Sequence, residues 1–197
     1  MIAPQQHSDF ILSQVDELLA VTGIHLHQLD AIAFGAGPGS FMGVRLATGV
    51  AQGLAYAIDR PVIPVSTLQA LAQSVSVRHG EKVLVGWDAR MSAIYWGIYA
   101  LNSDGLMQAV VADRLSAPDV IQLPDDEHCI ATGNAWEVYE SQLSDRLKQQ
   151  LIKHDKQHPH AEMVARIAAA KFAKGDILPP DQAEPVYIRD VVAKRQG

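Results

Sequence analysis

The residues with the clearest chemical potential form a glycine-rich stretch, GAGPGSFMGVR, from Gly35 to Arg45. A stretch of this kind between an apolar run and a helix is typical of phosphate-binding loops, in which backbone amides hold an anion. A nucleotide-binding P-loop also needs a lysine, but the first 80 residues contain none. The spaced-glycine dinucleotide pattern fails too, because Ser40 or Met42 occupies its last position. We interpret Gly37, Gly39 and Ser40 as a vestigial nucleotide loop or simply a tight strand-to-helix connection.

Other candidates for chemistry are few. Asp88 and Arg90 lie in WDARMSAIYW between two predicted strands, where a salt-bridged turn is a simpler interpretation than a catalytic pair. The histidines of KHDKQHPHAE are His154, His158 and His160, and a proline interrupts any helix there, so we expect a solvated connector and not a metal site. The sequence has no HExxH, CxxC or GxSxG motif. We therefore predict no catalytic residue, no metal and no cofactor.

The elements that must position these residues alternate between strand and helix. Apolar periodicity and turn residues predict helices over 7–20, 40–58, 67–74, 117–123, 135–151 and 161–175, and strands over 29–34, 60–66, 82–89, 92–101, 107–113 and 128–134. This alternation predicts an α/β protein with two lobes. The composition becomes polar around SVRHGEK, so we divide the chain into an N-terminal lobe of residues 1–78 and a C-terminal lobe and tail of residues 79–197.

Composition limits the classes of function. The formal net charge of -6 argues against a chain that holds nucleic acid through its own field, so any RNA should be held by a partner. A single cysteine, Cys129, lies in an apolar context and is expected to be a buried strand thiol. The sequence shows neither a signal peptide nor an apolar run long enough to cross a bilayer. We expect a cytoplasmic protein without membrane contact.

Two helices have more apolar surface than one core requires. Phe10 lies outside the apolar arc of the first helix. The helix over 40–58 is apolar around most of its circumference, with a seam of Ala47, Ala51 and Ala55 beside a bulkier one. Such a helix should be covered on two sides, by its own sheet and by something else.

These individually weak signals combine along nearly the whole chain. The segments, in order, are APQQHS, GPGSFMGVR, PVSTLQALA, DARMSAIYW, HPHAEMVARIAA and EPVYIRDVVA. In this combination the sequence resembles the bacterial TsaB (YeaZ) family. The resemblance implies the actin-like ATPase (ASKHA) superfold, in which two related lobes flank a nucleotide cleft. It also implies a supporting, non-catalytic role in forming threonylcarbamoyladenosine next to the anticodon of tRNAs that read codons beginning with A.

The resemblance further implies a TsaD-type paralogue as heterodimer partner and a TsaE-type ATPase that joins the pair, with tRNA reached only through the complex. The contact would involve the first two helices, and we assign to it Phe10, Gln14, Met42, Arg45, Ala47, Ala51 and Ala55. The same helices could instead form a homodimer when the chain is alone. Side chains at Asp88-Ala89-Arg90-Met91 stand where an active member of the superfold has a glycine-rich turn for phosphate.

The sequence departs from the family at its beginning. Family members open with a strand that carries an Asp-Thr phosphate turn, followed by two antiparallel strands, and this sequence starts after them. We therefore expect either a truncated chain or a start codon assigned too far downstream, and in both cases an incomplete N-terminal lobe whose strand 29–34 keeps an exposed edge.

Two other functions are weighed against the scaffold. The first is an autonomous phosphotransferase or ATPase of the same superfold, which the missing lysine and the DARM sequence argue against. The second is a peptidase, for which the sequence offers no nucleophile-base or zinc-ligand spacing.

Overall fold

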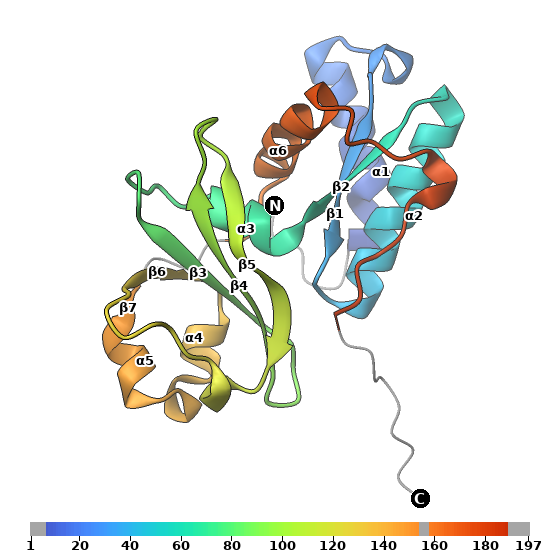
Figure 1. The fold of residues 1–197 in the computed structure, drawn as a ribbon. Helices are drawn as coiled ribbons and strands as arrows, with labels where there is room; N and C mark the ends of the chain where they lie inside the picture. Colours follow the sequence, from blue (N-terminus) through green and yellow to red (C-terminus); the bar gives the residue numbers. More distant parts are fainter. Residues whose placement is uncertain (1–6, 154–157, 189–197) are drawn as a thin grey trace, which may run out of the picture.

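The computed structural model describes residues 7–153 and 158–188, which form two lobes of mixed helix and strand (Figure 1). Each lobe contains a β-sheet with helices packed on it, so the predicted α/β class is confirmed. Within the described residues, no helix combines the length and the apolar character that a bilayer span requires.

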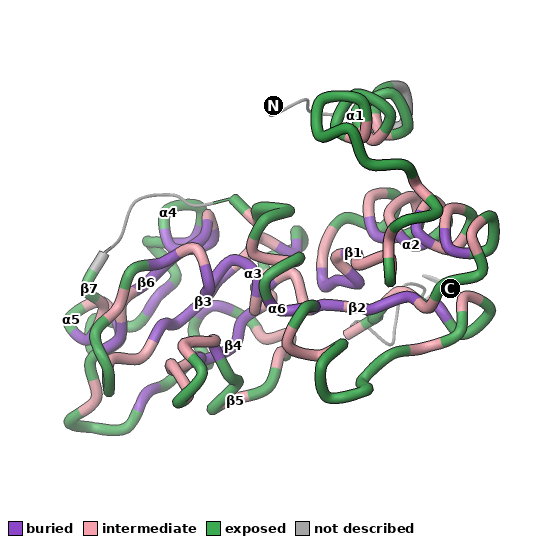
Figure 2. Tube along the Cα trace, turned by 90° about the horizontal axis from the view of Figure 1, so that it is seen from above, coloured by how far each residue is buried: buried purple, intermediate pink, exposed green. Residues whose placement is uncertain are grey.

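The N-terminal lobe is built on two parallel strands, β1 (Ile32–Gly37) and β2 (Val62–Ser66). Helix α2 (Phe41–Ile58) connects them, and its first turn is capped by the Ser40 hydroxyl, which accepts a hydrogen bond of 3.1 Å from the Gly43 amide. The alanines of α2 pack on the sheet with Phe34 and Val62. Helix α1 (His7–Thr22) lies over α2, away from the sheet, and is mostly exposed (Figure 2). The expected second cover of α2 is therefore α1.

The C-terminal lobe contains a five-stranded sheet in the order β5-β4-β3-β6-β7. Strands β3, β4 and β5 form an antiparallel meander, whereas β6 and β7 run parallel to β3. The bounds are β3 Lys82–Asp88, β4 Ile94–Leu101, β5 Met107–Ser116, β6 Cys129–Thr132 and β7 Leu151–Lys153, with helices α4 (Ala135–Val138) and α5 (Asp145–Gln150). Short 3-10 turns occupy Leu26–Gln28, Pro118–Val120, Glu140–Gln142 and Pro180–Gln182.

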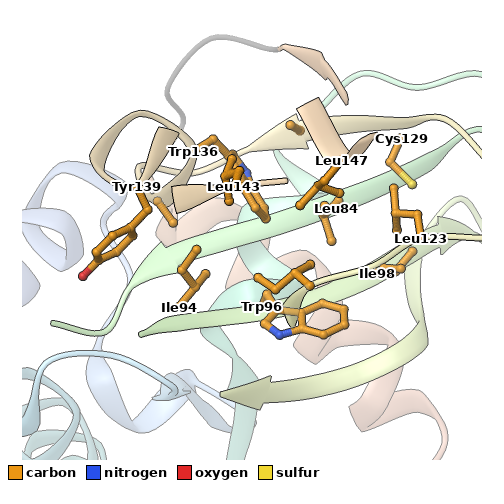
Figure 3. Packing of buried hydrophobic residues seen from close by; sticks show 13 residues of the cluster. Leu84, Ile94, Trp96, Ile98, Leu123, Cys129, Trp136, Tyr139, Leu143 and Leu147 are labelled. Atoms are coloured by element: carbon orange, nitrogen blue, oxygen red, sulfur yellow. The ribbon is translucent and has the colours of Figure 1, made fainter. Parts of the chain in front are cut away.

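Both faces of β3 are buried, which explains its continuous apolar sequence. Leu84 points to the face covered by α4 and α5, where one core cluster forms (Figure 3). That cluster also includes Ile94, Trp96, Ile98, Ile121, Leu123, Cys129, Trp136, Tyr139, Leu143 and Leu147. Val83 and Val85 point to the opposite face, where Leu68 and Leu71 of α3 (Thr67–Gln73) cover them. Because α3 also packs against β1 and β2, it joins the two lobes.

The end of the described chain returns to the N-terminal lobe. Helix α6 (Ala161–Ala173) packs Ile167 and Ala168 on the face of β1 and β2 opposite α2. Leu178 then forms a two-way backbone pair with Val62 on β2 (3.0 and 2.8 Å). The division at residue 78 stays a prediction, but residues 161–188, which we assigned to the C-terminal lobe and tail, lie against the N-terminal sheet.

Two predicted helices of the C-terminal lobe were wrong in extent. The single helix over 135–151 is three short pieces, because Leu143 adopts an extended conformation and Ser144 caps a new helix through the Leu147 amide. Its last residue, Leu151, begins β7. The segment 117–123 contains only the 3-10 turn Pro118–Val120, and its Ile121 and Leu123 enter the core as extended residues.

Candidate partner surface and inter-lobe cavity

One side of α1 presents apolar residues to solvent. At 100° per residue, Phe10, Gln14, Leu18 and Val21 fall within one arc of the helix, and all four are exposed. We call these four residues the α1 outer face. Leu18 is 65% exposed and Val21 is 80% exposed, whereas Ile11, Val15 and Leu19 on the adjoining side of the helix are half-buried. Sequence reasoning assigned neither Leu18 nor Val21 to the partner contact, so the outer face is more apolar than we expected.

The alanine seam of α2 faces the opposite way from our expectation. Ala51 is 4% exposed and Ala55 is fully buried, and both lie in the cluster formed with β1 and β2. Ala47 is half-buried. The assignment of Ala51 and Ala55 to a partner contact is therefore wrong: small side chains at these positions let α2 approach its own sheet closely.

The first turn of α2 is exposed but already engaged by the chain itself. Met42 is exposed, as expected for a contact residue. The Arg45 guanidinium lies 3.4 Å from the centre of the Phe41 ring, and its Nε donates a 2.7 Å hydrogen bond to the Tyr187 hydroxyl. Sequence reasoning missed Phe41 and Tyr187, which belong to segments 146 residues apart in the chain. Together with Arg45 they form an exposed aromatic and cationic cluster.

The glycine stretch is a tight connection that the C-terminal segment covers. Gly37 has φ of 114°, and a Cβ placed on it would lie 2.9 Å from the Val186 carbonyl oxygen. The Val186 amide donates a 2.7 Å hydrogen bond to the Ala36 carbonyl. Gly39 approaches Val44, and the Ser40 hydroxyl is occupied as the cap of α2. Gly37, Gly39 and Ser40 thus all have structural roles in this connection. Their part in binding a nucleotide stays a prediction.

A cavity of about 1140 Å³ opens between the two lobes beside this loop. It is bounded by the start of α2, by the connection between β3 and β4, by the end of β5 and by the C-terminal segment. The lining residues are Gly39, Ser40, Phe41, Val44, Trp87, Asp88, Ala89, Arg90, Met91, Tyr95, Arg114, Leu115, Asn134, Val186, Tyr187 and Ile188. The charged groups among them are one aspartate and two arginines.

The aspartate of the cavity is closely held. The Asp88 side chain is 5% exposed and forms an ion pair of 3.1 Å with Arg90. It also accepts hydrogen bonds of 2.7 Å from the Tyr139 hydroxyl and from the Arg90 amide. The bond to Asp88 raises the pKa of Tyr139 above its ordinary value. The expected salt-bridged turn is confirmed, and its carboxylate is engaged on both oxygens.

The connection between β3 and β4 is strained. Three consecutive residues without glycine, Arg90, Met91 and Ser92, have φ of 61°, 56° and 52°. This left-handed region costs an ordinary side chain about 1–3 kcal/mol per residue. Sequence reasoning identified Arg90 but not the strain, although a turn of this length without glycine was a usable signal.

The remaining candidates from the sequence are the cysteine and the histidines. Cys129 is buried in the sheet, as predicted, and burial raises the pKa of its thiol to about 12. The ring of His158 lies edge-on to Trp87, 5.9 Å between centres, and His160 precedes α6, whereas His154 lies outside the described residues. In the part of the chain that the structure describes, no group of three histidine, cysteine or acidic side chains is placed to hold a metal ion.

Comparison with known proteins gives consistent matches over nearly the whole chain. A family model described as "TsaD: tRNA N6-adenosine threonylcarbamoyltransferase" matches residues 1–196. The chain is 35% identical over 203 residues to the tRNA threonylcarbamoyladenosine biosynthesis protein TsaB of Escherichia coli (strain K12), covering 98% of this chain and 84% of that protein. It is 34% identical over 201 residues to the protein of the same name from Haemophilus influenzae, covering 97% and 83%.

A solved structure agrees with these matches. The crystal structure of an uncharacterized Pseudomonas aeruginosa protein with similarity to peptidase YEAZ superposes with a TM-score of 0.87 at 37% identity, covering 96% of this chain and 87% of that one.

Proposed function

This chain belongs to the TsaB (YeaZ) family and has its actin-like fold, and we propose that it acts as a non-catalytic accessory subunit in tRNA threonylcarbamoyladenosine biosynthesis. In this proposal it pairs with a TsaD-type transferase, and a TsaE-type ATPase joins the pair. The assembly would operate in the cytoplasm and would hold tRNA mainly through the other subunits, since this chain carries a net charge of -6.

The observation that carries the proposal is the α1 outer face. Phe10, Leu18 and Val21 stay exposed although the chain buries four separate apolar clusters elsewhere. Large apolar side chains gathered on one face of a helix are typical of a surface that a partner covers. Gln14 lies in the same arc and supplies a polar group beside them.

The cavity supports an accessory role over an autonomous phosphotransferase. A phosphotransferase needs a free carboxylate and a loop open to phosphate. Here both oxygens of Asp88 are engaged by Arg90 and Tyr139, and Val186 lies directly over Gly37. These contacts favour a chain that supports chemistry in a partner.

Val21→Asp tests the proposal. Placing a charge on the α1 outer face should weaken binding to the purified TsaD-type subunit at least tenfold, because the partner would bury an unpaired carboxylate. The measurement is isothermal titration calorimetry, followed by tRNA modification in a reconstituted reaction with both partner subunits. Unfolding by urea should change by less than about 1 kcal/mol, since Val21 is exposed and only the helix dipole disfavours a carboxylate in the last turn of α1.

Val120→Asp is the matched control. Val120 is also an exposed valine, but it lies in the C-terminal lobe. It should leave binding and modification as in the unaltered chain. If the unaltered chain neither binds the TsaD-type subunit nor stimulates modification, the accessory role is wrong. If it binds and Val21→Asp binds equally well, the role stands but the surface is misplaced. Sedimentation of the isolated chain with and without Val21→Asp will show whether the same face forms a homodimer.

A further inference from the structure

We propose that the mouth of the inter-lobe cavity is a second docking surface, which receives a carboxylate-bearing protein segment with a large apolar side chain. The cavity mouth, as we use the term, consists of Phe41, Arg90, Met91 and Tyr187. The inference rests on the proposed function, because the segment would belong to one of the two partner subunits. It adds a site that is separate from the α1 outer face.

The first argument is the strain in the connection between β3 and β4. Arg90, Met91 and Ser92 all occupy the left-handed region, where glycine would be free of strain. Strain of this kind persists where the surrounding structure enforces it, and it concentrates at functional sites. The enforcing contacts are visible here: Ala89 donates a backbone hydrogen bond of 3.0 Å to Ala93, and Asp88 accepts from the Arg90 amide.

The second argument is what the strained turn displays. Met91 is 86% exposed, so the strain does not serve to bury an apolar side chain. Phe41 and Tyr187, on two other segments, are also exposed and line the same cavity. Methionine, arginine and aromatic residues are the types enriched in the buried centres of protein interfaces. Apolar side chains from three separate segments therefore meet at one opening, and the space behind them can accept a further side chain.

The third argument is charge. Although the chain as a whole is acidic, the charged residues that line the cavity are Arg90, Arg114 and Asp88. The Arg90 guanidinium pairs with the almost fully buried Asp88 carboxylate, so the net positive charge of the lining comes from Arg114. Arg45 adds another cation where it stacks on Phe41. A positive opening on a negative protein is complementary to an acidic segment and disfavours a basic one.

The glycine loop distinguishes a protein segment from a phosphate ligand. The Ser40 hydroxyl caps α2, and the Val186 backbone lies against Gly37. These contacts occupy the side of the cavity where a phosphate would meet backbone amides. Arg90 and Met91 lie on the connection between β3 and β4, a different segment of the lining, and their exposed side chains are accessible to a segment with carboxylates.

The test uses three substitutions of Met91 in the full chain, with the purified TsaD-type subunit as probe, alone and with the TsaE-type ATPase. Met91→Glu should weaken one of these binding steps at least tenfold, because it removes the apolar contact and repels carboxylates. Met91→Lys should weaken the same step less than threefold, because its charge attracts them. Opposite charges on side chains of similar length thus report the sign of the partner's charge.

Met91→Gly separates docking from folding. Glycine relieves the left-handed strain, so the melting temperature should rise by a few degrees. The same variant should weaken the affected binding step about fivefold, because the apolar side chain is gone. Arg78→Glu is the control for a change of surface charge. Arg78 is an exposed arginine just before the start of β3, whereas Met91 follows the end of this strand, so the substitution should change no binding step.

Each outcome is decisive. Equal weakening by Met91→Glu and Met91→Lys would overturn the acidic segment, and no weakening by either would overturn the surface itself. Hydrogen exchange of residues 87–95 gives an independent measurement, in which protection by a partner subunit supports the proposal and protection by ATP or tRNA alone contradicts it. If the unaltered chain binds neither subunit, the proposed function fails and this inference with it. A chain that binds through Val21 but is insensitive at Met91 refutes only the second surface.

Discussion

The hydroxyl of Ser66 donates a hydrogen bond of 2.5 Å to the carboxylate of Asp113 across the two lobes. Ser66 ends β2 and caps α3, whereas Asp113 lies on β5. The other carboxylate oxygen accepts a hydrogen bond from the Tyr99 hydroxyl on β4. A Cβ at Gly97 would lie 2.8 Å from this carboxylate, so the missing side chain lets Asp113 reach over β4. One acidic group thus connects the cap of the joining helix to the second sheet.

Removing the Asp113 carboxylate should destabilise the contact between the two lobes. Asp113→Ala leaves the hydroxyls of Ser66 and Tyr99 without their acceptor, and a partly buried polar group that loses its partner costs about 1–3 kcal/mol. We expect the free energy of unfolding in urea at neutral pH to fall by about that amount. Asp119→Ala, at an exposed position in a 3-10 turn, should change it by less than about 0.5 kcal/mol. Equal effects of the two substitutions would show that the hydrogen bonds of Asp113 to Ser66 and Tyr99 contribute nothing to stability.

The stability of the chain should also depend on pH through Asp113. Burial raises the pKa of this carboxyl, against the opposing hydrogen bonds from Ser66 and Tyr99. The stability contributed by its protonated form is complete below the unfolded pKa of about 3.9 and is lost as pH rises through the folded pKa. Asp113→Asn removes the titration. The difference in unfolding free energy, variant minus unaltered chain, should therefore increase from about pH 4 toward neutral pH; a decrease would mean that the ionised form is the stabilised one.

The correction at the alanine seam of α2 gives a matched pair of substitutions. Ala55→Leu forces three additional carbons into a fully buried position against the sheet and should destabilise the chain by about 1–3 kcal/mol. Ala57→Leu, two residues further along the same helix, is exposed and should be nearly neutral. Thermal unfolding compares them directly. If Ala55→Leu is as stable as Ala57→Leu, the seam does not face the sheet.

Two glycines should respond in opposite ways to alanine. A Cβ at Gly86 would collide with the indole ring of Trp136, so Gly86→Ala must displace a core aromatic residue and should cost about 3 kcal/mol or more. Gly53 lies inside α2 with nothing near its missing Cβ, and Gly53→Ala should stabilise the helix by about 0.5–1 kcal/mol. Urea denaturation curves fitted with one common m-value test both predictions: the midpoint should fall for Gly86→Ala and rise for Gly53→Ala.

Cys129 should be chemically inert while the chain is folded. Burial raises the pKa of its thiol to about 12, and the neighbouring Glu127 acts in the same direction. Because the thiolate is the reactive form, iodoacetamide at pH 8 should leave the native chain unmodified and should label it fully in urea. Mass spectrometry distinguishes the two states. Rapid labelling of the native chain would contradict the burial of this strand.

The sequence allowed prediction of the features that depend on local pattern. Alternation of strands and helices indicated the α/β class, and Ser40 marked the start of α2 because its cap is local. The direction of the alanine seam was not predictable in the same way, since a helix that is apolar nearly all round does not reveal which side meets its sheet. Ala51 and Ala55 were misassigned for this reason. The cluster of Arg45 and Tyr187 depends on two segments 142 residues apart, which no local pattern connects.

The return of α6 and of the segment ending at Ile188 to the first sheet has a consequence for biosynthesis. A ribosome delivers the chain from its amino end, so α6, which covers one face of β1 and β2, emerges after both of these strands. The described strands of the C-terminal sheet all lie between Lys82 and Lys153, so they are synthesised before α6. During translation the C-terminal sheet can therefore fold before the N-terminal lobe is complete. Until α6 is synthesised, the apolar face of β1 and β2 that it covers stays exposed.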